Sequence, residues 1–303
     1  MAGSGVVVLT GGTGGAKLAR GMLDVVGGDL VAVANTGDDI EIYGGHVSPD
    51  PDLVTYWLAD RIDERGWGLA DDTFAVMDGL RELGVDVWFN LGDRDLAVCL
   101  RRAEQLDAGA SLTECLAELS AALGVGARVL PMTDDRVRTR VLAHGDWRSL
   151  QEFLIGERGA GPVEGVAFDG ASDATPTPAV LEALAAARAI VIGPSNPIIS
   201  IGPILAVPGL RQALVDASAP VVAVSPLVAG EVVKGPTEAF MRWAGHTLDA
   251  DGIATVYEGV IDGLVADERT DGVPVLETDV LMADAAGRRR VAEATLGFAE
   301  ALQ

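Results

Sequence analysis

The chain has 303 residues, of which 49% are apolar, and it carries a formal net charge of −23. A strongly acidic surface repels nucleic acid and anionic membranes, so we expect neither as a partner. No apolar run is long enough to span a membrane and no secretion signal is evident at the N-terminus, so the composition favours a cytoplasmic protein.

The first predicted strand covers residues 6–10 and runs into a glycine-rich turn, GGTGG at 11–15. Apolar residues then recur at helical spacing, which predicts a helix that begins near Gly14. The N–H groups and the positive dipole end of such a helix attract an anion, and glycines let a phosphate approach the backbone. We therefore interpret the turn as a phosphate site; the alternative is a tight turn that binds nothing.

The turn matches neither of the two common phosphate motifs. A dinucleotide fingerprint needs a small residue where Lys17 stands, and a Walker loop needs Ser or Thr where Leu18 follows that lysine. The second predicted strand, 30–35, ends in Asn35 instead of the lone acidic residue that binds a ribose. These departures argue against a nicotinamide-dependent oxidoreductase.

Four carboxylates follow the second predicted strand, two in NTGDD at 35–39 and two in SPDPD at 48–52: Asp38, Asp39, Asp50 and Asp52. Their mutual repulsion is costly unless a cation neutralises them, and carboxylates are common ligands of magnesium. The first pair is therefore a candidate metal or substrate site. For the second pair an alternative is open, because a helix predicted over about 48–64 gains from acidic residues in its first turn.

Three more predicted strands run into loops that carry polar groups. The strand at 86–91 runs into LGDRD, whose charged residues also fit a helix cap with a surface ion pair. The strand at 189–193 leads into GPSNPIISIGPIL, whose prolines hold Ser195 and Asn196 in one presentation, and the strand at 220–225 leads into PLVAGEVVKGP. Because ligands collect beyond the carboxyl ends of parallel strands, we expect these loops to form the site.

The alternation of strands and helices predicts a single α/β domain over 1–303, with a parallel sheet covered by helices on both faces. Between approximately 128 and 175 the alternation weakens, and RVRTRVLA there has the pattern of a half-buried strand. We therefore place a small α+β insertion in that region. Capping-box spacing predicts helix starts at Ser111 and Ser149. The two cysteines fall in predicted helices and indicate neither a disulfide framework nor a zinc site.

Six motifs occur in an order and spacing that resemble the 2-phospho-L-lactate transferase family of coenzyme F420 biosynthesis: GGTGGAK, NTGDD, SPDPD, LGDRD, GPSNPIISIGPIL and VSPLVAG…KGP. The resemblance extends from about Val6 to the last predicted helix, and bacterial members use phosphoenolpyruvate-derived donors. It implies a Rossmann-like fold, a homodimer and a magnesium-dependent transferase. The implied donor is a guanosine diphosphate ester of a small acid, and the implied acceptor is Fo, a riboflavin-like deazaflavin alcohol. The terminal hydroxyl of Fo attacks the phosphorus that bears the lactyl or enolpyruvyl group, and GMP leaves.

The resemblance also implies roles for individual residues. Asp52 and Asn90 match positions that contact the deazaflavin, although several family members have a basic residue where Asn90 stands. Asp38 matches a magnesium ligand, with Asp39 or Asp50 as further ligands, and either Asp38 or Asp50 takes the proton of the attacking hydroxyl. The guanosine-phosphate side is matched by Gly12, Thr13, Gly14, Gly15, Lys17, Ser195, Asn196 and Gly235.

A related branch of the same fold binds nucleotide sugars and regulates carbon or cell-wall metabolism, and this is the alternative function. The presence of LGDRD and of Asp52 favours the enzyme, since a regulatory binder needs no deazaflavin pocket. If the glycine turn cradles phosphate, Gly14→Val should abolish GDP binding and leave the fold intact.

Overall fold

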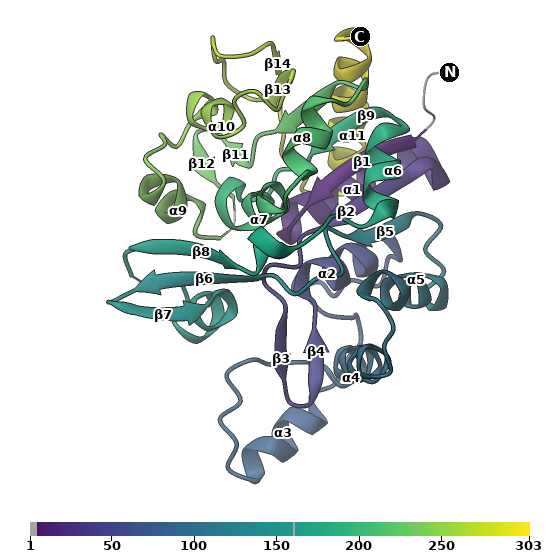
Figure 1. Cartoon of the computed structure of the whole chain (residues 1–303), viewed down its shortest axis with the longest axis vertical. Coiled ribbons are helices and arrows are strands. Elements are labelled where there is room, and N and C mark those ends of the chain that lie inside the picture. The colour runs from purple at the N-terminus through teal and green to yellow at the C-terminus, as the bar shows by residue number, and fades with distance from the viewer. Residues whose placement is uncertain (1–4, 160, 234) are drawn as a thin grey trace.

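The computed structural model describes residues 5–159, 161–233 and 235–303, and Lys234 lies outside them. Seven parallel strands form the central sheet in the order β14–β13–β10–β9–β1–β2–β5 (Figure 1). The predicted α/β class with a parallel sheet is therefore confirmed. In sequence order the strands of this sheet are β1 (Gly5–Thr10), β2 (Leu30–Ala34), β5 (Arg128–Pro131), β9 (Ala187–Ile192), β10 (Val221–Val224), β13 (Gly263–Ala266) and β14 (Val275–Glu277).

Alternate residues of each strand enter two separate cores, one on each face of the sheet. In β1, Val6 and Val8 belong to one core, while Val7 and Leu9 belong to the other, and all four are at most 1% exposed. Burial on both faces explains why this strand is continuously apolar. The first core is covered by α1 (Gly12–Val26), α2 (Pro49–Leu58) and α11 (Ala285–Ala301). The second is covered by α6 (Pro178–Ala185), α7 (Gly202–Ala206), α8 (Leu210–Val215) and α10 (Ala250–Val256).

Helix α1 follows β1 after a single residue, Gly11, so its first turn lies at the carboxyl edge of the sheet. It begins at Gly12, slightly earlier than predicted, and buries Leu18 and Met22 at helical spacing. Gly21 lets α11 pack closely, because a Cβ at this position would lie 2.3 Å from the carbonyl oxygen of Arg288. The position of the glycine turn is therefore fixed by packing on both sides.

The strand predicted at 86–91 is wrong, because these residues form no strand. The third strand of the central sheet along the chain is β5, which lies beside β2. Phe89 and Leu91 instead pack with Met77 and Cys99 in a small separate core. A short apolar run satisfies either a sheet or a local core, and periodicity alone does not separate the two. The local core lies among β3 (Ile40–Ile42), β4 (Gly45–Val47), α3 (Ala75–Glu82) and α4 (Asp93–Asp107), ahead of α5 (Leu112–Ala122).

Helix α2 is shorter than predicted, since it ends at Leu58 instead of near Glu64. Asp60 adopts the left-handed region at φ +53°, which stops a right-handed helix. Ile62 and Leu69 then form an isolated antiparallel bridge that closes a short loop. The loop brings Trp67 to one of the two cavities described below.

The region at 128–175 starts with a strand of the main sheet and continues as a separate antiparallel sheet of β6 (Arg138–Ala143), β7 (Asp146–Ser149) and β8 (Gly165–Asp169). Figure 1 shows this second sheet extending to one side of the central one. Burial alternates along β6, which confirms the half-buried strand that RVRTRVLA predicts. A π-helical turn follows over Glu152–Gly156, with the predicted exchange of hydrogen bonds between Ser149 and Glu152.

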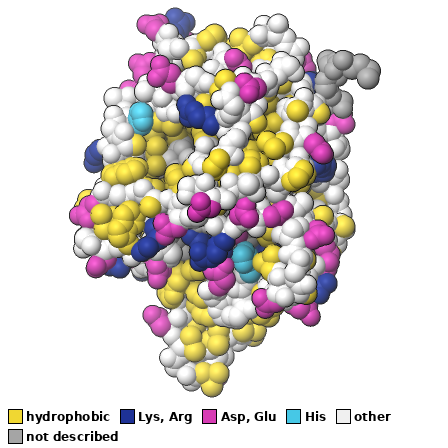
Figure 2. All heavy atoms as spheres, in the orientation of Figure 1, with side chains coloured by type: hydrophobic (Ala, Val, Ile, Leu, Met, Phe, Trp, Pro, Cys, Tyr) yellow, Lys and Arg dark blue, Asp and Glu magenta, His cyan; other side chains and the backbone are white. Residues whose placement is uncertain are grey.

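The remaining elements are the short hairpin β11 (Leu227–Val228) and β12 (Glu231–Val232), followed by α9 (Thr237–Trp243). The capping box at Ser111 is present at the start of α5, and Cys99 and Cys115 lie buried and unpaired in α4 and α5. Acidic side chains are spread over the face shown in Figure 2 instead of gathering in one patch. Among the described helices, none combines the length and apolarity needed to cross a bilayer.

Candidate functional site

Two cavities lie near the carboxyl edge of the central sheet, and a hydrogen bond joins a lining residue of one to a lining residue of the other. The glycine-turn cavity, of about 570 Å³, is lined by the first turn of α1, the loops that follow β9 and β10, and residues 280–283. The aromatic cavity, of about 420 Å³, is lined by the start of α2, the loop that carries Trp67, and residues 88–91. Asp50 joins the two, because it lines the aromatic cavity and its carboxylate accepts the N–H of Gly12, which lines the other.

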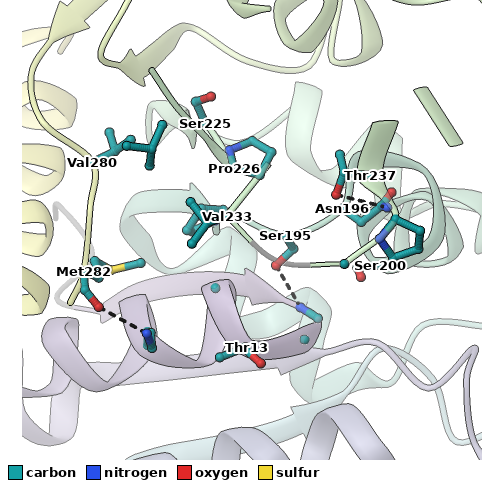
Figure 3. A pocket seen from close by; sticks show the side chains of 18 of the residues that line it. Thr13, Ser195, Asn196, Ser200, Ser225, Pro226, Val233, Thr237, Val280 and Met282 are labelled. Atoms are coloured by element: carbon teal, nitrogen blue, oxygen red, sulfur yellow. Dashed lines mark hydrogen bonds between the residues drawn. The ribbon is translucent and has the colours of Figure 1, made fainter. Parts of the chain in front are cut away.

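The glycine-turn cavity brings together most residues predicted for the guanosine-phosphate side. The backbone of Gly12 is uncovered on the side where a side chain would stand, because a Cβ there would have no atom within 4 Å, and its φ is +66°. Ser195 Oγ accepts the N–H of Gly11 at 3.2 Å, which ties the loop after β9 to the start of α1 (Figure 3). The predicted residues that line this cavity are Gly12, Thr13, Gly14, Lys17, Ser195, Asn196 and Gly235, whereas Gly15 does not line it.

Gly14 and Gly15 serve close packing, which corrects the expected effect of Gly14→Val. A Cβ at Gly14 would lie 2.0 Å from the carbonyl oxygen of Pro194, and one at Gly15 would lie 2.1 Å from Thr10 Oγ1. A larger residue at Gly14 therefore collides with backbone before it reaches a bound anion. Only Gly12 has the bare, outward-facing geometry that the phosphate interpretation requires.

The two ends of the glycine-turn cavity differ in chemistry. At one end Lys17 Nζ donates to the carbonyl oxygen of Met282 at 3.2 Å (Figure 3). The same Nζ lies 5.9 Å from the ring centre of Trp57. At the other end Asn196 caps the turn that follows it, accepting the N–H groups of Ile198 at 2.9 Å and Ile199 at 3.2 Å. The prolines of GPSNP and this cap both restrict the backbone of the loop.

The wall between the cavities contains two buried carboxylates that share one amide. Asn35 Nδ2 donates to Asp38 Oδ1 at 3.1 Å and to Asp50 Oδ2 at 2.9 Å, and Gln151 Nε2 donates to Asp38 Oδ2 at 3.1 Å. Burial and the charges of Asp50 and Asp39 raise the pKa of Asp38 well above its usual range. Burial raises the pKa of Asp50 to about 6, against the hydrogen bonds from Asn35 and Gly12, which lower it.

Asp39 is turned away from this pair and toward the ribbon of β3 and β4. Its Oδ1 accepts from Ser48 Oγ at 2.8 Å, and its Oδ2 lies 3.0 Å from His46 Nε2. In the parts of the chain that the structure describes, neither Asp38 nor Asp50 forms an ion pair with a basic side chain. Two buried acids that form no ion pair with a basic side chain fit a site for a divalent cation. Asp38 and Asp50 share the amide of Asn35, whereas Asp39 does not contact that amide.

Asp52 and Asn90, the residues predicted for the acceptor, both line the aromatic cavity, but each already has a protein partner. Arg102 Nη1 donates to Asp52 Oδ2 at 3.0 Å and to the carbonyl oxygen of His46 at 2.9 Å, and its Nη2 donates to Asp52 Oδ1. Asn90 Oδ1 accepts from Arg81 Nη2 at 2.8 Å. A basic residue therefore does approach this position, although it comes from α3.

Asp95 is a buried residue of the aromatic cavity whose place there the sequence analysis did not predict. LGDRD allows a helix cap with a surface ion pair, but Asp93 accepts the N–H groups of Ala75 and Val76 at the start of α3 instead of capping its own helix. The N–H groups of Arg94 and Asp95 at the start of α4 are accepted by Asp72. Asp95 instead points inward, is 8% exposed and accepts the hydroxyl of Tyr56 at 2.8 Å. Burial and the charge of Asp52 raise the pKa of Asp95 to about 7. Gln151 was missed as well, because the weak alternation at 128–175 gives no sign of where it points.

Comparison with known proteins places the chain among transferases. The model of the family described as 2-phospho-L-lactate transferase CofD matches residues 6–292. A phosphoenolpyruvate transferase from Kitasatospora aureofaciens is 39% identical, over 97% of this chain and 98% of that protein. A 2-phospho-L-lactate transferase from Methanosarcina mazei is also 39% identical, over 87% of each chain.

A solved structure supports the fold. A member of the UPF0052 family from Bacillus halodurans superposes with a TM-score of 0.63, over 98% of this chain and 99% of that chain. Its sequence identity is 19%, so the likeness concerns the architecture and not the chemistry.

Proposed function

Because the chain belongs to the 2-phospho-L-lactate transferase family, we propose that it moves a phospho-lactyl or phospho-enolpyruvyl group from a guanosine diphosphate ester to the terminal hydroxyl of the deazaflavin Fo, releasing GMP. The observation that carries the proposal is the link between two unlike cavities through one carboxylate, Asp50, which lines the aromatic cavity and accepts the N–H of Gly12 in the other. A transfer between two bound substrates needs such a link, whereas a protein that only binds a nucleotide needs one cavity.

The glycine-turn cavity suits the donor. The first turn of α1 faces it with the positive end of the helix dipole, and Gly12 presents bare backbone there. Lys17 lies along the same wall. The aromatic cavity suits the acceptor ring, because Tyr56, Trp67 and Trp88 line it and aromatic faces stack on a flat ring.

Asp50 is the better of the two candidates for the general base. It lines the aromatic cavity and touches Gly12, so it stands between acceptor hydroxyl and donor phosphorus. Asp38 lines neither cavity and is held by Asn35 and Gln151. With a pKa of about 6, Asp50 is mostly ionised at neutral pH and can accept the hydroxyl proton. The new bond joins the acceptor oxygen to phosphorus, and the bond from phosphorus to the GMP oxygen breaks.

Charge balance supports a magnesium ion that Asp38 and Asp50 would hold, because Asn35 donates to both; Asp39, whose oxygens face Ser48 and His46, is the less suited second ligand. A diphosphate adds charge to a wall whose buried acids already lack a basic partner among the described residues, and a helix N-terminus offers only about half a charge. When bound there, a divalent cation would neutralise these charges and would polarise the phosphoryl group. Gln151 and Asn35 orient Asp38 for this role.

The test is a transfer assay with Fo, magnesium and either the lactyl or the enolpyruvyl ester, in which GMP and the deazaflavin product are measured together. We expect equal amounts of both products from at least one donor and no turnover in EDTA. Asp50→Asn should lower kcat by about 10²–10⁴-fold while Fo and GDP still bind. Asp38→Asn should lose most turnover yet keep Fo binding.

Asp146→Asn is the matched control, because its side chain is 73% exposed and lies in β7, and it should be as active as the parent. Binding of both ligands without any transfer from either ester would contradict the proposal. Absence of Fo binding together with tight nucleotide binding would favour a regulatory protein instead.

A further inference from the structure

Asp95 lines the aromatic cavity, and among the described residues only one of its two carboxylate oxygens has a hydrogen-bond partner. Asp95 Oδ1 accepts the hydroxyl of Tyr56 at 2.8 Å, whereas no described residue forms a hydrogen bond with Oδ2. Oδ2 lies 3.7 Å from the position that a Cβ of Gly68 would occupy, and both residues line the cavity. Asp95 is 8% exposed and Oδ2 is not among the buried atoms that lack a partner, so this oxygen is open to a ligand or to water.

The neighbouring Asp52 differs in this respect. Both of its oxygens accept from Arg102, and the two side chains are 6% and 2% exposed. Its hydrogen-bonding capacity toward a ligand is therefore largely used. Both carboxyl groups line the same cavity, but of the two only Asp95 has an oxygen without a hydrogen-bond partner among the described residues.

The surroundings of Asp95 decide whether this oxygen carries a proton. The groups that face Asp95 are the carboxylate of Asp52, the guanidinium of Arg102, the hydroxyl of Tyr56, the thiol of Cys99 and, at its backbone N–H, the carboxylate of Asp72. Since Arg102 is committed to Asp52, a second charge on Asp95 has no cation of its own. Burial and Asp52 together raise the pKa of Asp95 to about 7, so the carboxyl is neutral in slightly acidic solution.

We propose that Asp95 is the polar anchor of the aromatic cavity, donating a hydrogen bond from Oδ2 to a carbonyl oxygen on the edge of a flat heteroaromatic acceptor. Tyr56 is the positioning residue, because its hydroxyl occupies Oδ1 and leaves Oδ2 for the ligand. The pyrimidinedione edge of Fo offers such a carbonyl, so the inference rests on the proposed function and assigns one end of the acceptor to this wall.

The sign of the pH dependence follows. Below about pH 7 the carboxyl is protonated and donates; above it, the proton is lost and the bare carboxylate repels a carbonyl oxygen. Acceptor affinity should therefore fall as pH rises. Asp95→Asn should remove this fall, because its amide can accept from Tyr56 through the oxygen and donate to the ligand through the nitrogen at every pH.

The experiment measures Fo dissociation constants by fluorescence from about pH 5.5 to about pH 8.5 for the parent, Asp95→Asn, Asp95→Ala and Tyr56→Phe. The quantity compared is the ratio of each variant's affinity to that of the parent at the same pH, which removes any titration of Fo itself. We expect Asp95→Asn to equal the parent at low pH and to bind about tenfold more tightly at high pH. Asp95→Ala should bind about tenfold more weakly than the parent at low pH.

Tyr56→Phe provides a readout that a purely structural role would not change. Its hydroxyl lowers the pKa of Asp95, so removing it should move the pH midpoint of Fo binding upward. Affinity for GDP should be unchanged in all variants. A pH-independent ratio for Asp95→Asn, or full Fo affinity in Asp95→Ala, would overturn the anchor. A parent that binds no Fo at any pH would instead overturn the proposed function.

Discussion

The two cavities are linked through Asp50 but are built in different ways. The glycine-turn cavity is made largely of backbone and small residues in loops that leave neighbouring strands of one sheet. The aromatic cavity lies outside the sheet, between α2, the residues ahead of α4 and the turn that contains Gln151. A phosphate site of the first kind needs only chain geometry at a helix start. A ring site of the second kind needs side chains from distant segments, held by a buried ion pair.

The largest expected effect breaks the ion pair behind the aromatic cavity. Arg102→Ala leaves the carboxylate of Asp52 buried without its cation, so we expect the free energy of unfolding to fall by about 3–5 kcal/mol. Arg101→Ala is the matched control, because its side chain is 54% exposed and its surface pairs with Glu104 and Glu118 contribute little. Equal stability of the two variants in denaturant unfolding would show that the cavity wall does not depend on this pair.

The second prediction sharpens the account of the glycine turn. Gly14→Ala forces a Cβ against the carbonyl oxygen of Pro194, and we expect a loss of about 3 kcal/mol of stability. The Cβ of Gly12→Ala meets no atom, so this variant should lose only about 1–2 kcal/mol of stability, which is the cost of a non-glycine residue in the left-handed region. Thermal unfolding of both variants, with GDP titrations of each, separates the packing glycine from the one that faces the cavity. If Gly14→Ala proved the more stable of the two, the packing role assigned to Gly14 would be wrong.

The third prediction concerns the carboxylates that join the cavities. The raised pKa values of Asp38 and Asp50 mean that the folded state holds protons more tightly than the unfolded chain. Stability from Asp50 is therefore lost as pH rises from about 4 through about 6, and stability from Asp38 is likewise lost as pH rises. A magnesium ion beside them should offset this loss only when they are ionised. We expect magnesium to raise Tm by about 2–4 °C at neutral pH and hardly at all near pH 5. The same Tm gain at both pH values would place the cation elsewhere.

The smallest expected effect tests whether ligand binding in the aromatic cavity is independent of ligand binding in the glycine-turn cavity. Trp67 is 39% exposed and lines the aromatic cavity, and its ring centre lies 4.4 Å from Cζ of Arg65. Trp67→Ala should weaken Fo binding by about 1 kcal/mol and leave GDP affinity unchanged. Trp243→Ala, equally exposed but in α9 and outside the lining of both cavities, should change neither affinity. Loss of both affinities in Trp67→Ala would mean that the cavities are coupled.

Sequence reasoning succeeded where local geometry carries the information. The turn between β1 and α1, the capping box at Ser111 and the half-buried strand β6 each follow from neighbouring residues, and the structure confirms them. It failed at 86–91, where an apolar run fits a local core as well as a sheet. The role of Gly14 was also misjudged, because the atom that excludes a side chain there belongs to Pro194, far along the chain.

The sequence by itself determined the parallel α/β class and the glycine turn at the carboxyl edge of the sheet, because both depend on periodicity and on backbone freedom within a few residues. Only the tertiary structure decided how the carboxylates divide their work. Asp52 is paired with Arg102, and Asp39 lies beside His46. Asp50 links the linings of the two cavities through Gly12, and Asp95 has one oxygen without a hydrogen-bond partner among the described residues. An aspartate has the same side chain in every motif, and its charge and availability are set by the partners that folding brings within hydrogen-bond distance.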